Sequence, residues 1–206
     1  MAARMSREES KALTREKLIA SARNVFARLG MAGASIDRIA EEAGFSKGAF
    51  YSNFESKEEI FFELLEEVAK EDSRALAQAL ESVSDPESAI KAICDWARAK
   101  TRDPNVPLLL LELARKARSD EAVGKRHRQL FHEQWIAVGK LAMRILPEGS
   151  ERITPLMLGG LILELTYSNA TLLHDSPTSS DLIAAALHGL RDGALWHATQ
   201  TDSQDE

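Results

Sequence analysis

The stretch SIDRIAEEAGFSKGAFYSNFESK, residues 35–57, decides the fold of this chain. The apolar residues before Gly44 recur at helical spacing, and Ser46 stands where a second short helix can begin. Two short helices joined by a tight turn that contains glycine are typical of a helix-turn-helix, whose second helix enters the major groove of DNA. The stretch therefore predicts sequence-specific DNA binding.

The second helix of this stretch has one apolar face and one polar face. Phe50 and Phe54 lie four residues apart, so they share the face that we expect to be buried. Gly48 lies on the opposite face, where the absence of a side chain lets the helix approach DNA closely. This arrangement predicts a helix that is held from one side and reads bases with the other.

The polar residues of this region suggest individual roles at the DNA. Lys47 can bind a guanine edge or a phosphate, Asn53 can read an adenine edge, and Ser52 can bind a base edge or a phosphate. Tyr51 is expected to donate its hydroxyl group to a phosphate. Lys57 stands at the start of the next helix, where free backbone N–H groups already favour an anion, so a phosphate held there would fix orientation.

The same residues also allow a less specific interpretation. A two-helix corner with glycine occurs in many all-helical proteins. Tyr51 and Phe54 are also compatible with ordinary core aromatics, and Lys57 with a solvated surface lysine.

The charge of the chain is distributed unevenly. The net charge is −6, but residues 1–54 carry nine Lys and Arg against six Asp and Glu, whereas the remainder carries 17 against 26. Because salt screens electrostatic attraction beyond a Debye length of about 8 Å, the N-terminal part can attract phosphates although the whole chain is acidic. The acidic remainder would discourage other faces from binding DNA.

The periodicity of the sequence is helical almost throughout, and no segment has the pattern of a strand. We therefore expect an all-α fold, with a three-helix helix-turn-helix domain in residues 1–54 and a larger helical domain in residues 55–206. Thr14 is expected to cap the first helix after a frayed arm, and Ser119 to open the seventh. About nine helices are expected, spanning residues 14–29, 35–43, 46–54, 57–83 (the connector between the domains), 86–101, 105–118, 119–146, 155–173 and 180–199.

Residues 14–65 resemble the DNA-binding domain of the TetR-type (tetracycline-repressor-like) transcriptional regulators. The resemblance rests on residues 22–30, 35–48, 50–54 and 56–57, and it covers about a quarter of the chain. It implies a DNA-binding regulator, in most cases a repressor, with a C-terminal helical domain that dimerises and binds a small-molecule inducer. Two reading heads would then engage half-sites about 34–36 Å apart on a near-palindromic operator.

The resemblance also implies which positions face DNA, namely those of Lys47, Ala49, Tyr51, Asn53 and Lys57. Ala49 stands where the family often has a hydroxyl residue, and Asn53 where it often has His or Tyr. Both departures affect which operator is read. With the chemistry considered above and the helix start, the predicted DNA-binding set is Ser46, Lys47, Gly48, Ala49, Tyr51, Ser52, Asn53 and Lys57.

Two C-terminal helices carry apolar stripes beside small residues such as Gly159 and Gly160, which suits close helix packing. Two copies would form a four-helix dimer interface. The alternative is that these stripes bury the core of each protomer. The predicted interface residues are Leu158, Leu161, Ile162, Leu165, Ile183, Ala186, Leu187, Leu190 and Ala194.

The effector site is expected to combine apolar walls with a few polar groups, although core packing is the alternative for each of its residues. Glu112 is unusual because it is a carboxylate within the apolar run LLLLELA. It can pair with Arg115 or Lys116, face water or, if buried, favour a cationic or hydrogen-bond-donating ligand. The predicted lining residues are Trp96, Leu109, Glu112, Phe131, Gln134, Trp135, Thr166 and Asn169.

Other classes of protein have little support in the sequence. No pair of histidines has the spacing of a zinc site, as the five-residue separation of His127 and His132 illustrates, so we expect no metal and no other cofactor. Cys94, the single cysteine, fits a buried structural thiol in a reducing compartment. We find neither a signal peptide nor an apolar run of about 18 residues, which predicts a cytoplasmic protein. The alternatives are a small enzyme and a helical protein-interaction module without sequence-specific DNA binding.

Overall fold

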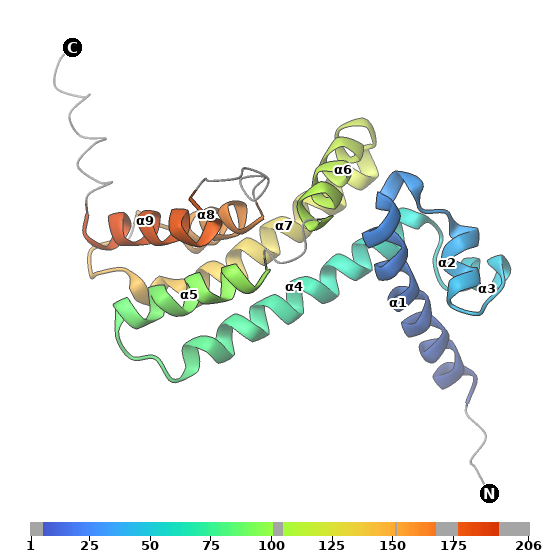
Figure 1. Ribbon diagram of the computed structural model, residues 1–206, viewed down its shortest axis with the longest axis horizontal. Coiled ribbons are helices and arrows are strands. Elements are labelled where there is room, and N and C mark those ends of the chain that lie inside the picture. Colours follow the sequence, from blue (N-terminus) through green and yellow to red (C-terminus); the bar gives the residue numbers. More distant parts are fainter. Residues whose placement is uncertain (1–5, 101–104, 151, 168–176, 194–206) are drawn as a thin grey trace, which may run out of the picture. The chain divides into compact units, whose positions relative to one another are not determined.

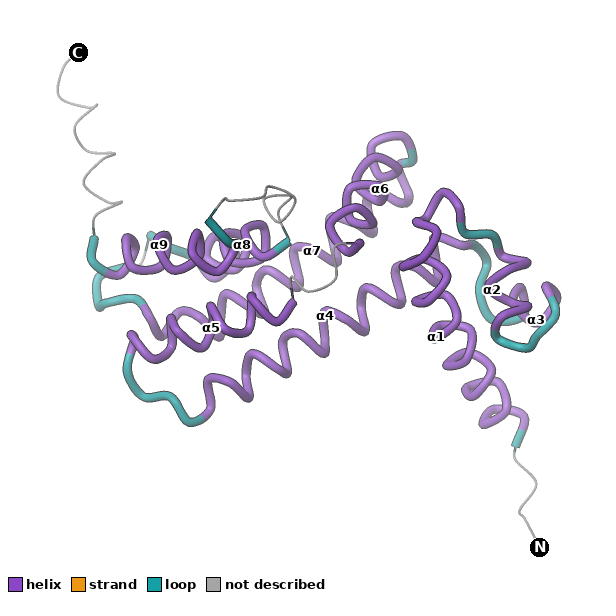
Figure 2. The backbone as a smooth tube through the Cα atoms, viewed as in Figure 1, coloured by secondary structure: helices purple, strands orange, loops and turns teal. Residues whose placement is uncertain are grey.

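The structure is a computed structural model that describes residues 6–100, 105–150, 152–167 and 177–193. Within these ranges every regular element is a helix, nine of them α-helices and one a short 3-10 helix, and no strand is present (Figures 1 and 2). The prediction of an all-α fold is therefore confirmed.

The helices follow one another with short connections. None of those in the described part of the chain is long and apolar enough to cross a lipid bilayer. The elements are α1 (Arg7–Gly33), α2 (Ile36–Glu42), α3 (Lys47–Tyr51), α4 (Lys57–Glu81), α5 (Pro86–Lys100), α6 (Asn105–Ser119), α7 (Glu121–Ala142), η1 (Met143–Ile145), α8 (Pro155–Thr166) and α9 (Ser179–Arg191).

The chain divides into two compact units, but not at the boundary expected after residue 54. The first unit consists of residues 1–69 together with 108–127, and the second of residues 70–107 together with 128–206. The start of α4 belongs to the first unit because its aromatic residues complete that unit's core. Phe61 of α4 packs edge-to-face against Phe26 of α1, with 4.9 Å between the ring centroids.

The first helix begins earlier than the sequence predicted. Ser6 caps α1 and forms a capping box with Glu9, whose backbone N–H donates to the Ser6 hydroxyl oxygen over 3.1 Å. Thr14 lies inside the helix and donates its hydroxyl to the carbonyl oxygen of Ser10. The expected frayed arm is therefore helical from Arg7, and the assignment of Thr14 as the cap was wrong.

Two further boundaries differ from expectation. Asp120, rather than Ser119, caps α7, because its carboxylate accepts the N–H of Val123. α3 ends at Tyr51, three residues before the predicted end, and Ser52 is its C-cap. The predicted C-terminal ends of the last two helices lie outside the described residues.

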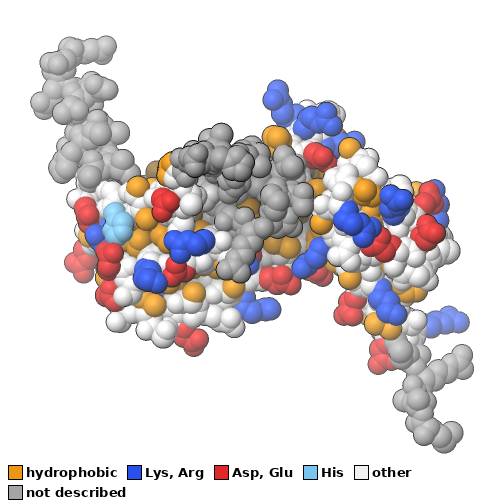
Figure 3. All heavy atoms as spheres, viewed as in Figure 1, with side chains coloured by type: hydrophobic (Ala, Val, Ile, Leu, Met, Phe, Trp, Pro, Cys, Tyr) orange, Lys and Arg blue, Asp and Glu red, His pale blue; other side chains and the backbone are white. Residues whose placement is uncertain are grey.

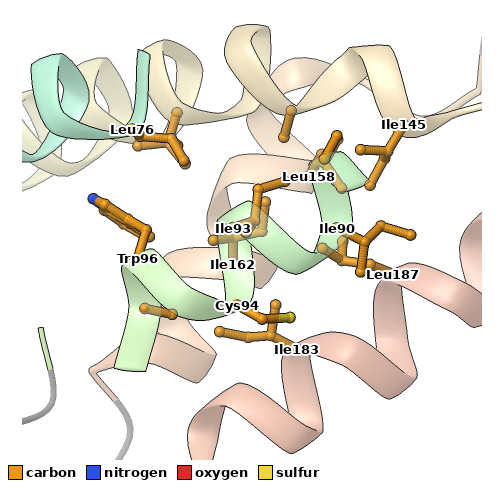
Figure 4. Close-up of a cluster of buried hydrophobic side chains, with 14 of the residues drawn as sticks. Leu76, Ile90, Ile93, Cys94, Trp96, Ile145, Leu158, Ile162, Ile183 and Leu187 are labelled. Carbon is orange, nitrogen blue, oxygen red and sulfur yellow. The ribbon is translucent and has the colours of Figure 1, made fainter. Parts of the chain in front are cut away.

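The second unit is built around an apolar core to which α4, α5, α7, η1, α8 and α9 contribute (Figure 4). The largest side chains of this core include Leu76, Leu80, Ile90, Ile93, Trp96, Val138, Ile145, Leu158, Ile162, Ile183 and Leu187. Cys94 is buried beside them, and this burial raises the pKa of its thiol.

Four of the predicted dimer-interface residues belong to this protomer core. Leu158, Ile162, Ile183 and Leu187 are each at most 1% exposed. A side chain already covered by its own chain has no surface left for a partner, so their assignment to the interface was wrong. Their helical spacing reflected burial within the protomer, the alternative left open by the sequence.

Close helix packing at the glycines is present, but it joins two helices of one chain. An added Cβ atom at Gly159 of α8 would lie 1.8 Å from the carbonyl oxygen of Trp135 in α7. One at Gly139 of α7 would lie 1.7 Å from the carbonyl oxygen of Pro155 in α8. The two backbones are therefore in direct contact, and neither position has room for a side chain.

This contact predicts the effect of a single methyl group. Gly159→Ala is expected to lower the free energy of unfolding by about 3 kcal/mol, because either α8 must move away from α7 or the atoms must overlap. Urea unfolding followed by circular dichroism measures the change. Gly48→Ala is the control, since its nearest neighbour would lie at an ordinary 3.6 Å, and it should cause no loss. Equal stability of the two variants would contradict the close contact.

Candidate DNA-binding surface

The five residues of α3 are held in place by aromatic side chains on its inner face. Phe50 is fully buried and Phe54 is 1% exposed. Their ring centroids lie 5.6 Å apart, and the guanidinium of Arg15 in α1 stacks over the Phe54 ring at 4.1 Å. The predicted buried face of the reading helix is thereby confirmed.

The turn between α2 and α3 has the geometry that the sequence indicated. Gly44 has a φ of 79°, which lies in the left-handed region that glycine adopts without strain. Its N–H donates to Glu41, and the N–H of Phe45 donates to the carbonyl oxygen of Ala40 over 2.8 Å, so the two bonds form a Schellman motif. Ser46 then caps α3 by accepting the N–H of Ala49.

The outer face of α3 presents polar groups to solvent. Ser46, Lys47, Gly48 and Ser52 are exposed, and Tyr51 retains 52% of its accessible surface although it is a large aromatic residue. An exposed tyrosine among small polar residues is available for contact with another molecule. Ala49, in contrast, is half-buried.

Lys47 forms an ion pair with Asp37 of α2, with 2.9 Å between the ammonium nitrogen and a carboxylate oxygen. The hydrogen bond to Asp37 raises the pKa of Lys47. Both side chains are more than half exposed. The pair is therefore weakened by water and salt, and a phosphate can compete with Asp37 for the lysine.

Asn53 is held against the protein. Its side-chain amide donates to the carbonyl oxygen of Ala49 over 2.8 Å, and its Oδ1 atom is buried without a hydrogen-bond partner among the described residues. Its backbone carbonyl oxygen accepts a hydrogen bond from Arg15. Reading an adenine edge, as the sequence predicted, therefore requires the side chain to change rotamer. The unpaired Oδ1 atom lowers the cost of that change.

Lys57 has a structural role that the sequence did not reveal. Its ammonium donates to the carbonyl oxygens of Met31 and Ala34, over 2.6 and 2.9 Å. These two bonds join the start of α4 to the corner after α1, by which we mean residues 30–34, where the last turn of α1 leads into α2. An ammonium has three N–H donors, so contact with a phosphate stays a prediction beside this role.

Glu112 of α6 binds the same corner from its other side. The chain breaks helical geometry at Gly30, where φ is 68°, and one further turn follows. The Glu112 carboxylate accepts the backbone N–H groups of Met31 and Ala32, over 2.7 and 3.2 Å, and so caps this last turn. Glu112 therefore belongs to the DNA-binding unit and does not line an effector site, contrary to the sequence interpretation.

The other predicted effector residues are dispersed. Leu109 lies in the first unit, and Asn169 lies outside the described residues. Thr166 is buried, but its hydroxyl donates to the carbonyl oxygen of Ile162 in its own helix, which leaves it no evident role in recognition. In the second unit the remaining residues are Trp96, which is buried, and Phe131, Gln134 and Trp135, which are half-buried.

The surface charge of the first unit is mixed. In the view of Figure 3, Lys and Arg side chains on this unit alternate with Asp and Glu side chains rather than forming a continuous basic face. Ion pairs such as Arg28–Glu42 contribute to this pattern. The local basic excess is modest, so the helix-turn-helix geometry identifies the surface better than its charge does.

Two short helices joined by a tight turn at Gly44, the second with an exposed polar face, place this region in the class of helix-turn-helix DNA-binding proteins. Residues 18–64 match the family model described as bacterial regulatory proteins of the tetR family. Residues 18–64 are thus similar to the DNA-binding domain of that family, and the relatives that resemble more of the chain are described as transcriptional regulators.

Individual relatives agree with this assignment. The regulator LmrA of Bacillus subtilis is 27% identical over 187 residues, which cover 82% of this chain and 96% of LmrA. The repressor Rv1474c of Mycobacterium tuberculosis is 31% identical over 55% of this chain and 56% of its own length. FadR of Bacillus subtilis, solved in complex with stearoyl-CoA, shares the fold with a TM-score of 0.66 at 16% identity, covering 86% of this chain and 98% of FadR.

The contacts of Lys57 predict a loss of stability rather than of DNA binding alone. Lys57→Met keeps the aliphatic stem but leaves two carbonyl oxygens without a donor, so the free energy of unfolding should fall by about 2 kcal/mol. Hydrogen exchange should quicken at residues 31–34. Lys11→Met removes an exposed lysine of α1 and should change neither quantity. If the two variants behave alike, the corner does not depend on Lys57.

Proposed function

We propose that this regulator is a homodimeric repressor that a small apolar effector releases from a near-palindromic operator. The observation that carries the proposal is the outer face of α3, where exposed polar side chains and Tyr51 stand on a helix fixed by buried phenylalanines. Repression is supported by relatives described as repressors, including Rv1474c. Such a regulator acts where the DNA is, which favours the cytoplasm.

Each exposed residue has a role that its chemistry supports. Lys47 leaves Asp37 to bind a guanine edge or a phosphate, and Tyr51 donates its hydroxyl to a phosphate. Ser52 already donates to the carbonyl oxygen of Gly48 in its own helix, so it meets DNA as an acceptor. Asn53 reads a base only after it releases Ala49.

Dimerisation through α8 and α9 is supported by the apolar residues that the protomer leaves partly uncovered. Met157 of α8 is 58% exposed, which is high for a large apolar side chain. Leu161 and Leu165 of α8 and Ala186 and Leu190 of α9 are half-buried. These residues are the remaining part of the predicted interface, and Ala194 lies outside the described residues.

Release by an effector would require helices that contribute to both units. α4 runs from residues of the first unit into the second, and its first turn holds the corner after α1 through Lys57. The regulator would have one geometry that binds the operator and one that does not. An effector bound to the second unit shifts the balance between them only to the extent that its affinities for the two geometries differ. FadR, which shares the fold, was solved with stearoyl-CoA, and this supports an effector with an apolar part.

The proposed DNA contacts predict selective losses of affinity. Lys47→Ala and Tyr51→Phe should each weaken binding to a duplex selected from a random library by about tenfold, without changing the melting temperature. If Lys47 binds a phosphate, the slope of log K against log salt should also decrease by about one. Lys91→Ala, an exposed lysine of α5, is the control and should bind as the unaltered chain. Unchanged affinity in both variants would show that α3 does not read DNA.

The proposed dimer predicts the form of the operator. Selected duplexes should contain two inverted half-sites with centres about one helical turn apart. Met157→Asp, which places a charge in the proposed interface, should shift the chain to monomers in sedimentation experiments and abolish protection of paired half-sites. Ala185→Asp, at an exposed position of α9, is the control for an added charge on these helices, and it should remain dimeric. A single half-site in the selected DNA would exclude the dimeric reading mode.

A further inference from the structure

The second unit contains a buried carboxylate, Asp72 of α4, which is 1% exposed. One of its oxygens lies 2.6 Å from the ammonium nitrogen of Lys100 in α5. The other accepts the hydroxyl of Tyr167, at the end of α8, over 2.6 Å. A buried charge must be paired to be tolerated, and here each oxygen has its own donor.

Tyr167 is bound firmly as a donor in this cluster. Burial, together with the charge and the hydrogen bond of Asp72, raises the pKa of Tyr167 far above its usual range. The hydroxyl therefore stays protonated and directed at the carboxylate. Each oxygen of Asp72 is in turn occupied by one donor, Tyr167 or Lys100.

Trp96 of α5 supplies a donor with no acceptor. The residue is 6% exposed, yet its indole N–H has no hydrogen-bond partner among the described residues. Figure 4 shows the indole nitrogen pointing away from Ile93 and Ile162 of the surrounding core. Leaving such a donor buried and unpaired is unfavourable, and an incoming acceptor would remove that cost.

Trp96 and Lys100 are four residues apart on α5, so they are neighbours on one helix face. Lys100 is 27% exposed, and its ammonium has three N–H donors, one of which is directed at Asp72. This face of α5 therefore offers donors to a ligand, while the buried carboxylate of Asp72 in α4 already has partners. Glu112, the other acidic residue considered for ligand recognition, is bound to the N–H groups after Gly30.

We propose that the second unit binds an apolar molecule through an oxygen acceptor group, with a carboxylate as the best match, and that Trp96 and Lys100 are the recognising donors. The apolar part lies beside the indole ring of Trp96. This inference rests on the proposed effector binding and specifies its chemistry. It predicts that a molecule with a cationic head group binds more weakly, because Asp72 already has two donors and Trp96 and Lys100 offer donors alone.

Two probes with the same tail and opposite head groups test the proposal. Decanoate carries an acceptor head, and decylammonium carries donors alone. In calorimetric titrations of the full chain, below the concentrations at which the probes form micelles, decanoate should bind at least about tenfold more tightly. In the nitrogen–proton spectrum the indole resonance of Trp96 should move downfield with decanoate and not with decylammonium.

Trp96→Phe removes the N–H group while keeping an aromatic ring. It should weaken decanoate binding by about tenfold or more and leave decylammonium unchanged. Lys91→Ala, which alters an exposed lysine on the same helix, is the control and should affect neither probe. The proposal is overturned if decanoate does not bind, if decylammonium binds as tightly, or if Trp96→Phe leaves decanoate affinity unchanged.

Operator binding by the chain without any probe separates this inference from the proposed function. If Trp96→Phe binds the selected duplex normally but loses decanoate, the recognition chemistry is established in a functional regulator. If decanoate binds as expected and no duplex is bound specifically, the proposed function fails while the ligand site stands. The opposite result, specific DNA binding with no preference for decanoate, removes the inference alone.

Discussion

Burial of Phe50 and Phe54 is the interaction on which the DNA-binding surface depends. A helix of five residues is not stable in isolation, because ordering its first turn costs more than its few hydrogen bonds return. Each buried aromatic ring contributes about 1.5–3 kcal/mol by leaving water, and Arg15 adds a stacked guanidinium from α1. The stability of α3 thus comes from its inner face, and the outer face is left for recognition.

The corner after α1 is held by two helices in complementary ways. Lys57 of α4 supplies donors to its carbonyl oxygens, and Glu112 of α6 accepts its N–H groups. Either side chain leaves backbone groups unsatisfied if it withdraws. The geometry of residues 30–34 is therefore sensitive to both helices, and α1 is the helix that carries Arg15 to the end of α3. A small displacement at this corner can therefore reach α3 through α1 and Arg15.

The sequence predicted the helix-turn-helix well because each of its signals is local. Ser35, Gly44 and Ser46 act within a few residues of their own positions, and the structure has the caps and the turn that they indicated. Helical spacing identified buried stripes in α8 and α9, but it does not say whether the covering surface belongs to the same chain. The roles of Lys57 and Glu112 depend on partners 23 to 81 positions away, which no local pattern encodes. Asp72 did leave a signal, a carboxylate in register with Val68, Leu76 and Leu80 on one face of α4.

The lone thiol of Cys94 has a practical consequence for following this protein in solution. It lies in the core of the second unit at 6% exposure, and its raised pKa keeps it in the unreactive protonated form. Alkylating fluorophores are therefore expected not to react with Cys94 under native conditions. A single cysteine introduced at an exposed site on α3, such as Ser52→Cys, can carry a dye without first removing the native sulfur. The chain is in this sense suited to distance measurements between the two DNA-binding units of the proposed dimer.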